Sequence, residues 1–145
     1  MEVLGAVSII ASLAAFTSSS VTIIGQVARS SGTITTLTKE LTIIEIILRE
    51  TENTLRSFRS FSAVPDSIRV CLDFCLQKRK DVLRIIDKIA PDSKDGTRVS
   101  FAKKWRMVVM STLYESEVVG GYNSFRDSVL LLRDLTSEYV RTVKI

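Results

Sequence analysis

The stretch of sequence that decides the fold is residues 34–58, which read ITTLTKELTIIEIILRETENTLRSF. Apolar side chains recur there at alternating intervals of three and four residues, and Thr51 is the one polar residue on that line. Charged side chains occupy the other faces, a pattern typical of a long amphipathic helix in a bundle. We therefore expect a helix over roughly residues 33–60. The line comprises Ile34, Leu37, Leu41, Ile44, Leu48, Leu55 and Phe58, and Ile43, Ile46 and Ile47 widen it.

Three further segments carry an apolar stripe of the same periodicity. They cover residues 1–28, the stretch 66–90 and the chain after Thr112, where the spacing of Thr112 and Glu115 fits a capping box and predicts a fresh helix start. A shorter apolar pattern at residues 98–110 predicts one more helical piece, and polar or proline-containing stretches separate the segments. Long amphipathic segments joined by short loops favour an antiparallel bundle. We therefore expect an all-α fold, an antiparallel four-helix bundle with a short additional helix before the last long helix.

The length and the residue types indicate a single domain, residues 1–145, without catalytic chemistry. The chain has no histidine, which removes the commonest general base and a common metal ligand. Cys71 and Cys75 lack the two further ligands of a structural zinc site, and bridging them along one helix would strain it. No glycine-rich loop matches a phosphate cradle. We expect a non-enzymatic protein without cofactor or metal, in which both thiols are buried and reduced.

The first 28 residues form an almost uncharged helix, because no charged side chain lies between Glu2 and Arg29. One interpretation is a core helix of the bundle; the other adds release from the bundle and entry into a bilayer, where charged side chains are costly. The expected membrane-inserting side chains are Val3, Leu4, Val7, Ile10, Leu13, Ala14, Phe16, Val21 and Ile24. The side chains expected to line a pore are Glu2, Ser8, Ser12, Ser19 and Thr22.

Basic side chains gather in two short runs of the chain. They read either as ordinary solvated surface or as a surface that attracts anionic lipid headgroups. Nucleic acid is not an expected partner, because no recognition-helix signature or set of exposed stacking aromatics accompanies the charge. The expected headgroup ligands are Lys78, Arg79, Lys80, Lys103, Lys104 and Arg106.

Four stretches resemble the fungal HeLo-like N-terminal domains of NLR-like STAND receptors and amyloid-signalling proteins. They are the opening MEVLGAVSIIASLAAFTSSSVTIIGQV (residues 1–27), LTKELTIIEIILRETENTL (37–55), VPDSIRVCLDFCLQ (64–77) and KKWRMVV (103–109). The resemblance covers essentially the whole chain and rests on helix order and pattern. That family resembles, in turn, the four-helix killer domain of the necroptosis pseudokinase and the N-terminal domains of plant helper immune receptors.

The resemblance implies a cell-death execution domain of innate immunity. Such a domain would be cytoplasmic at rest, would form homo-oligomers on activation, and would permeabilise the plasma membrane through its N-terminal helix, here Val3 to Ala28. Its partners would be anionic membrane lipids, copies of itself, and an upstream NLR-like or amyloid-signalling protein. The chain would then be either an excised domain of a larger protein or a stand-alone protein. The alternative is a non-membranolytic helical module that signals and oligomerises through its helix faces.

Overall fold

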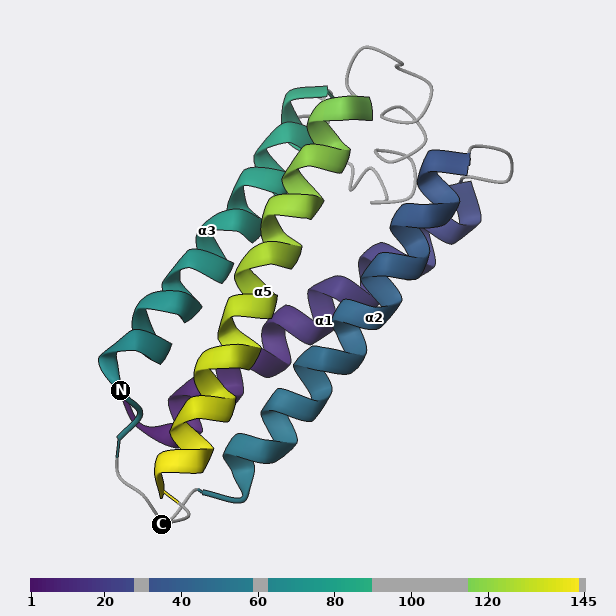
Figure 1. Cartoon of the computed structure of the whole chain (residues 1–145). Helices are drawn as coiled ribbons and strands as arrows, with labels where there is room; N and C mark the ends of the chain where they lie inside the picture. The colour runs from purple at the N-terminus through teal and green to yellow at the C-terminus, as the bar shows by residue number, and fades with distance from the viewer. Residues whose placement is uncertain (28–31, 59–62, 90–114, 144–145) are drawn as a thin grey trace.

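The computed structural model describes residues 1–27, 32–58, 63–89 and 115–143, and four helices account for nearly all of them. The helices are α1 (Val3–Val27), α2 (Gly32–Arg56), α3 (Asp66–Ile89) and α5 (Glu115–Val143). The helices α1 and α3 run in one direction, and α2 and α5 run in the opposite direction (Figure 1). The all-α four-helix bundle is thus confirmed. The expected short helix at 98–110 lies outside the described residues.

The arrangement places α5 between α2 and α3 and puts α1 behind them (Figure 1). The most extensive helix contacts join α1 to α2 and α3 to α5, and α1 contacts α3 over a smaller area. The start of α1 is tied to the linker between α2 and α3, because the amide of Val64 donates a 3.0 Å hydrogen bond to the carbonyl of Met1. The helix α1 therefore crosses the back of the bundle from the α3 side toward α2.

Backbone hydrogen bonds of the connecting residues mark the end of α2 and the start of α3. The helix α2 ends at Arg56, earlier than expected, because the amide of Phe58 bonds the carbonyl of Leu55 in a tighter turn of 3.0 Å. The carbonyl of Pro65 then accepts bonds from two amides in the first turn of α3, those of Ile68 and Arg69. Proline suits this position because a helix start needs no amide hydrogen there.

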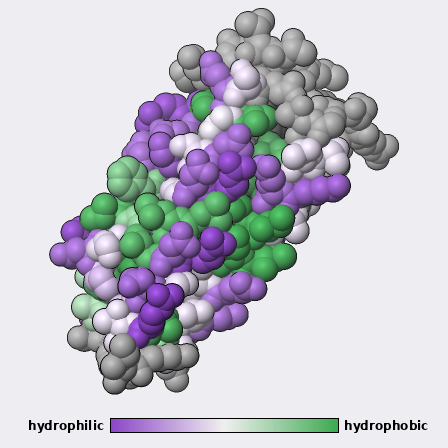
Figure 2. Space-filling model, viewed as in Figure 1, coloured by the Kyte–Doolittle hydropathy of each residue, from purple (hydrophilic) through white to green (hydrophobic). Residues whose placement is uncertain are grey.

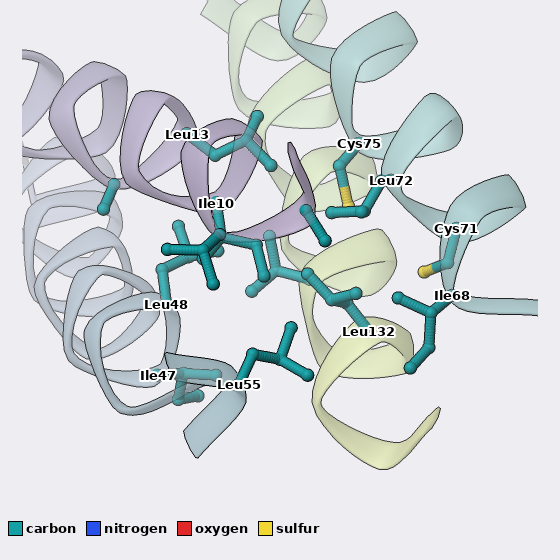
Figure 3. Packing of buried hydrophobic residues seen from close by; sticks show 14 of the residues in the cluster. Ile10, Leu13, Ile47, Leu48, Leu55, Ile68, Cys71, Leu72, Cys75 and Leu132 are labelled. Carbon is teal, nitrogen blue, oxygen red and sulfur yellow. The ribbon is translucent and has the colours of Figure 1, made fainter. Parts of the chain in front are cut away.

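The apolar stripes expected from the sequence meet in one core, with contributions from all four helices (Figure 3). The polar interruption Thr51 is buried, and its hydroxyl donates to the carbonyl of Ile47 at 2.8 Å, so it has a partner within its own helix. Ile43 and Ile46 do not widen the buried stripe as expected, since both are exposed. The labelled core residues are Ile10, Leu13, Ile47, Leu48, Leu55, Ile68, Cys71, Leu72, Cys75 and Leu132.

The helices α3 and α5 approach each other closely at Gly121. A Cβ atom at that position would lie 3.1 Å from Cγ2 of Val82, closer than ordinary van der Waals contact. Along the same contact the thiol of Cys71 donates to the carbonyl of Ser128 at 3.4 Å. Cys71 and Cys75 are both buried and free, as expected from the sequence.

Candidate membrane-inserting helix

Within the described part of the chain, α1 is the one helix long and apolar enough to cross a membrane. The span covers Val3–Thr22, and 44% of its most apolar window is buried inside the bundle. At about 1.5 Å per residue, a helix of this length matches the roughly 30 Å hydrocarbon core of a bilayer. Length and hydropathy therefore allow α1 to span a bilayer, and they equally fit a core helix.

The apolar face of α1 is the face that docks. Ile10 and Leu13 are completely buried and point toward the core side chains of α2, α3 and α5 (Figure 3). Three of the other expected membrane-inserting side chains are also buried in the core, namely Val3, Val7 and Ala14. Phe16 and Val21 are partly buried, and Leu4 is 60% exposed. The burial of Ile24 lies outside what the structure describes.

Four of the expected pore-lining side chains share the opposite face of α1, and the fifth, Glu2, directly precedes the helix. All five are exposed in the bundle, together with Gly5 and Ala15 between them. This face carries no charge beyond the first turn, so it is a strip of small and hydroxyl-bearing residues. The strip members are Ser8, Ser12, Ser19 and Thr22.

Among the residues that the structure describes, two side-chain hydrogen bonds join α1 to α3 and α5. On the α3 side, the guanidinium of Arg79 donates to the hydroxyl of Ser12 at 2.6 Å. On the α5 side, the hydroxyl of Tyr122 donates to the hydroxyl of Ser20 at 2.9 Å, in a fully buried contact. These two bonds hold the middle and the second half of α1 against different helices.

Aromatic rings surround the Ser20–Tyr122 bond. Phe16 stacks on Tyr122 with ring centroids 6.2 Å apart and meets Phe125 edge-on at 5.5 Å. Burial raises the pKa of Tyr122 well above its usual range, outweighing the opposite effect of its bond to Ser20. The Tyr122 hydroxyl therefore keeps its proton at neutral pH and remains a donor to α1.

Two hydroxyl groups of α1 are bonded inside the helix itself. Thr17 is buried and donates to the carbonyl of Leu13 at 2.8 Å, and Thr22 donates to the carbonyl of Ser18 at 3.1 Å. Such bonds to the preceding turn move with the helix. Undocking α1 would therefore leave these two hydroxyls paired while breaking the bonds of Ser12 and Ser20.

The structure describes three of the six expected headgroup ligands, and all three lie on α3. Arg79, expected to bind lipid, is only partly exposed and is engaged by Ser12. Lys80 is exposed and Lys78 partly exposed, while Lys103, Lys104 and Arg106 lie outside the described residues. An open groove of about 390 Å³ runs along this side of α3, lined by Asp73, Leu76, Gln77, Arg79, Lys80 and Leu83.

The carboxylate of Asp73 belongs to the same groove as Arg79 and Lys80. It opposes the binding of an anion there, since like charges at close range repel. Arg79 keeps its positive charge when it donates to the neutral hydroxyl of Ser12, so two basic side chains, Arg79 and Lys80, line the groove beside this carboxylate.

Sequence reasoning missed the role of Ser20 and Tyr122 as a pair. Ser20 follows Leu13 by seven residues and Ala6 by fourteen, so it continues the buried seam of α1. That spacing was the available signal, and the partner on α5 required the three-dimensional structure. In the described ranges no cluster of three or more His, Cys, Asp or Glu side chains could hold a metal ion.

Comparison with known proteins provides no relative for this bundle. The chain matches no protein-family model, no curated protein and no solved structure. The resemblance to the HeLo-like family stays a prediction, and the observations that bear on function are the two faces of α1 and its bonds to α3 and α5.

Proposed function

We propose that this chain is a cell-death execution domain that oligomerises and permeabilises the plasma membrane through α1. The observation that carries the proposal is the division of α1 into a docked apolar face and an exposed, uncharged face of small polar residues. A helix with these two faces can exchange the bundle core for lipid on one side and a water-filled lumen on the other. The HeLo-like resemblance implies the same activity.

The apolar face of α1 sets the free energy of that exchange. Each buried Val, Ile or Leu side chain loses about 1.5–3 kcal/mol when it moves from the core into water. A bilayer interior restores this contribution, because hydrocarbon is as apolar as the bundle core. The resting helix thus stays docked in water and gains an alternative site only beside a membrane, which fits a domain that is cytoplasmic at rest.

The hydroxyl groups of α1 set a second requirement. Thr17 and Thr22 keep their bonds in any environment, but Ser12 and Ser20 lose Arg79 and Tyr122 on release. Unpaired hydroxyls are costly in lipid, so released helices would associate and pair them with one another or with lumen water. We therefore propose that several copies insert together, with Ser8, Ser12, Ser19 and Thr22 lining the lumen and Glu2 at its mouth.

A dye-release assay with vesicles tests the proposal. The intact chain, oligomerised by an inducible tag at its C-terminus, should release dye from vesicles that contain anionic lipid. Leu4→Glu is the decisive variant, because Leu4 is 60% exposed in the bundle yet lies inside the span. A charge there costs about 2.5–3.5 kcal/mol at the centre of a membrane helix and less near an end, so leakage should fall clearly while the fold is retained.

The matched control is Ser137→Glu, which adds the same charge at an exposed position of α5. It should leak dye like the unchanged protein. Leu4→Glu is preferred over a charge at Ile10 or Leu13, because both of these side chains are core residues and their replacement would unfold the bundle. No leakage by the unchanged oligomer would sink the proposal, and a Ser137→Glu control that loses as much leakage as Leu4→Glu would show that the loss does not come from α1.

A second candidate function is a helical signalling module that never enters lipid. The observation that favours it is the set of large apolar side chains exposed on the other helices, among them Ile43, Phe74 and Leu131. Exposed apolar side chains of this size commonly mark contacts with other proteins. A chain that binds an upstream NLR-like or amyloid-signalling protein but leaks no dye when oligomerised would support this candidate.

A further inference from the structure

One arginine of α3 lacks the carboxylate partner that its neighbours have. Arg69 and Arg84, on the same helix, form ion pairs of 3.6 and 3.8 Å with acidic side chains three residues away. Among the described residues Arg79 forms no such pair, and its one hydrogen-bond partner is the neutral hydroxyl of Ser12 at 2.6 Å. In this part of the chain, therefore, no bonded carboxylate neutralises the charge of Arg79.

Arg79 lies at the boundary between α1 and the open groove of about 390 Å³ on α3. The lining residues carry two basic side chains, Arg79 and Lys80, and one acidic side chain, Asp73, which leaves a net charge of +1. Leu76 and Leu83 add apolar walls. The groove therefore offers an anion two cations and an apolar surface beside them.

The groove lies on the side of α3 that meets α1, away from the hydrophobic surface at the front of the bundle. Figure 2 shows that surface in green, crossing the middle of the face formed by α3, α5 and α2. Val70 is an exposed apolar residue of α3 and precedes Arg79 by nine residues, so the two lie on opposite sides of the helix. A ligand of Arg79 therefore meets α1 and not the hydrophobic front.

A phosphate group is the anion that suits this arrangement. The planar guanidinium of an arginine donates two parallel hydrogen bonds to phosphate oxygens, and such charge-assisted bonds are about twice as strong as bonds between neutral groups. Lys80 adds a second positive charge, and the two leucines suit the apolar part of a phospholipid. A phosphate oxygen in the groove is thus a stronger acceptor for Arg79 than the hydroxyl of Ser12.

We propose that Arg79 exchanges Ser12 for a phosphate group, and that this exchange loosens the middle of α1. In water the guanidinium holds Ser12. Beside an anionic membrane it turns into the groove, and Ser12 loses its partner. The bond between Tyr122 and Ser20 remains, so the exchange is the first step of release. The inference rests on the proposed function, because it describes how α1 leaves its resting place.

Titration with inorganic phosphate tests the exchange without a membrane. Two groups that compete for one guanidinium weaken each other by the same factor. Ser12→Ala should therefore lower the phosphate Kd about fivefold, and Arg79→Gln should raise it about tenfold. Ser8→Ala, at an exposed position one turn earlier on α1, is the matched control and should leave the Kd unchanged. Amide resonances around Arg79 follow the titration by NMR, with chloride at equal ionic strength as the reference.

Hydrogen exchange of α1 tests the loosening and distinguishes free phosphate from lipid. The amides around Ser12 should exchange about fivefold faster in saturating inorganic phosphate than in chloride. Vesicles containing phosphatidylglycerol should accelerate them at least as much, and vesicles of phosphatidylcholine alone should not. In Ser12→Ala these amides should already exchange at the faster rate in chloride.

Three results would overturn the proposal. The first is a phosphate Kd that Ser12→Ala leaves unchanged. The second is slower exchange of α1 in phosphate, which would show that Arg79 binds phosphate and Ser12 together. The third is acceleration by vesicles alone, which would assign the effect to the bilayer. If circular dichroism shows that Arg79→Gln does not fold, Lys80→Gln, at an exposed residue of the groove, should raise the Kd in its place.

The failure of this inference can be told apart from the failure of the proposed function. The phosphate titration needs no membrane and reports only on Arg79 and Ser12. Dye release can therefore persist when Ser12 and phosphate prove independent, and the competition can be present in a chain that releases no dye.

Discussion

The hydroxyl groups of Tyr122 and Ser20 lie 2.9 Å apart in the interior of the bundle, although the residues are 102 positions apart in the sequence. Tyr122 donates and Ser20 accepts, and both side chains are buried. A buried hydroxyl without a partner costs free energy, so the bond between the two groups stabilises both side chains in their buried positions. This bond ties the second half of α1 to α5.

Replacing Tyr122 with phenylalanine should destabilise the bundle. The ring and its stacking on Phe16 remain, but Ser20 loses its donor, and the expected loss is about 1–3 kcal/mol in the free energy of unfolding. Urea denaturation measures the loss, and hydrogen exchange should show it first in the amides of α1. Adding Ser20→Ala should cost less than the sum of the two single changes, because it removes the orphaned partner.

The control for this pair is Ser19→Ala. Ser19 is the exposed neighbour of Ser20 on α1, so its hydroxyl contributes little to stability and the change should stay within about 0.5 kcal/mol. Equal losses in Ser19→Ala and Tyr122→Phe would contradict the assignment of the buried bond.

The stability of the bundle should fall as the pH rises above about 10, the pKa of tyrosine in an unfolded chain. Burial raises the pKa of Tyr122, so above that pH the unfolded chain loses a proton that the folded chain retains. The unfolded state is then favoured, and stability that is present below pH 10 is lost at higher pH.

Urea denaturation at rising alkaline pH measures this effect. Tyr122→Phe removes the titrating group and should flatten the loss between about pH 10 and 11. Tyr139→Phe, at a partly exposed tyrosine of the same helix, controls for the loss of a hydroxyl elsewhere. An alkaline loss that is identical in the unchanged protein and in Tyr122→Phe would exclude Tyr122 as its origin.

The two glycines of α5 should respond in opposite ways to alanine. At Gly120 an added Cβ meets nothing within 4 Å, so Gly120→Ala should stabilise the protein by up to about 1 kcal/mol through helix propensity. At Gly121 the added Cβ would crowd Val82, which offsets that gain, and a larger side chain such as leucine should cost about 1–3 kcal/mol by overpacking. Thermal melts of the three variants make the comparison. Equal effects of alanine at both positions would contradict the close approach of α3 and α5.

The two thiols should be inert in the folded protein. Cys71 and Cys75 are at most 2% exposed, which keeps the reagent away from both. The hydrogen bond between the two thiols together with burial raises the pKa of Cys71, and the same bond lowers the pKa of Cys75, so the protection of Cys75 rests on its burial. Only a thiolate reacts quickly with iodoacetamide, so labelling should proceed no faster than unfolding exposes the thiols. Mass spectrometry follows the labelling, with the urea-unfolded chain as the fully reactive reference. Rapid modification under native conditions would show that α3 opens without global unfolding.

The sequence predicted the four long helices and the centre of each buried stripe correctly. Periodicity suffices for this, because residues such as Leu41, Leu48 and Leu55 recur on one face of any helix with their spacing. It also predicted the two faces of α1, since apolar and small polar residues alternate there with helical period. Interruptions such as Thr17 did not move the stripe, because a hydroxyl bonded to its own helix can be buried.

The edges of the stripes could not be predicted. Ile43 and Ile46 flank the stripe of α2, and whether such a side chain is covered depends on the angle at which the neighbouring helix crosses. Leu4 was expected to widen the apolar face of α1 and is exposed instead, because its spacing places it beside Ser8, Ala15 and Thr22. Bonds between distant segments, such as Arg79 with Ser12, depend on the register between helices, which periodicity within one helix does not contain.

The hydrogen bond inside α1 at Thr17 has a consequence for protein engineering. Its hydroxyl reaches only the carbonyl of Leu13 among the described residues, so valine, which has the same shape, should fit the site without repacking its neighbours. Thr17 is therefore a position at which the hydropathy of α1 can be raised while its surface shape stays constant. A series of variants built there would separate the effect of the hydrophobicity of α1 from the effect of its packing in the core.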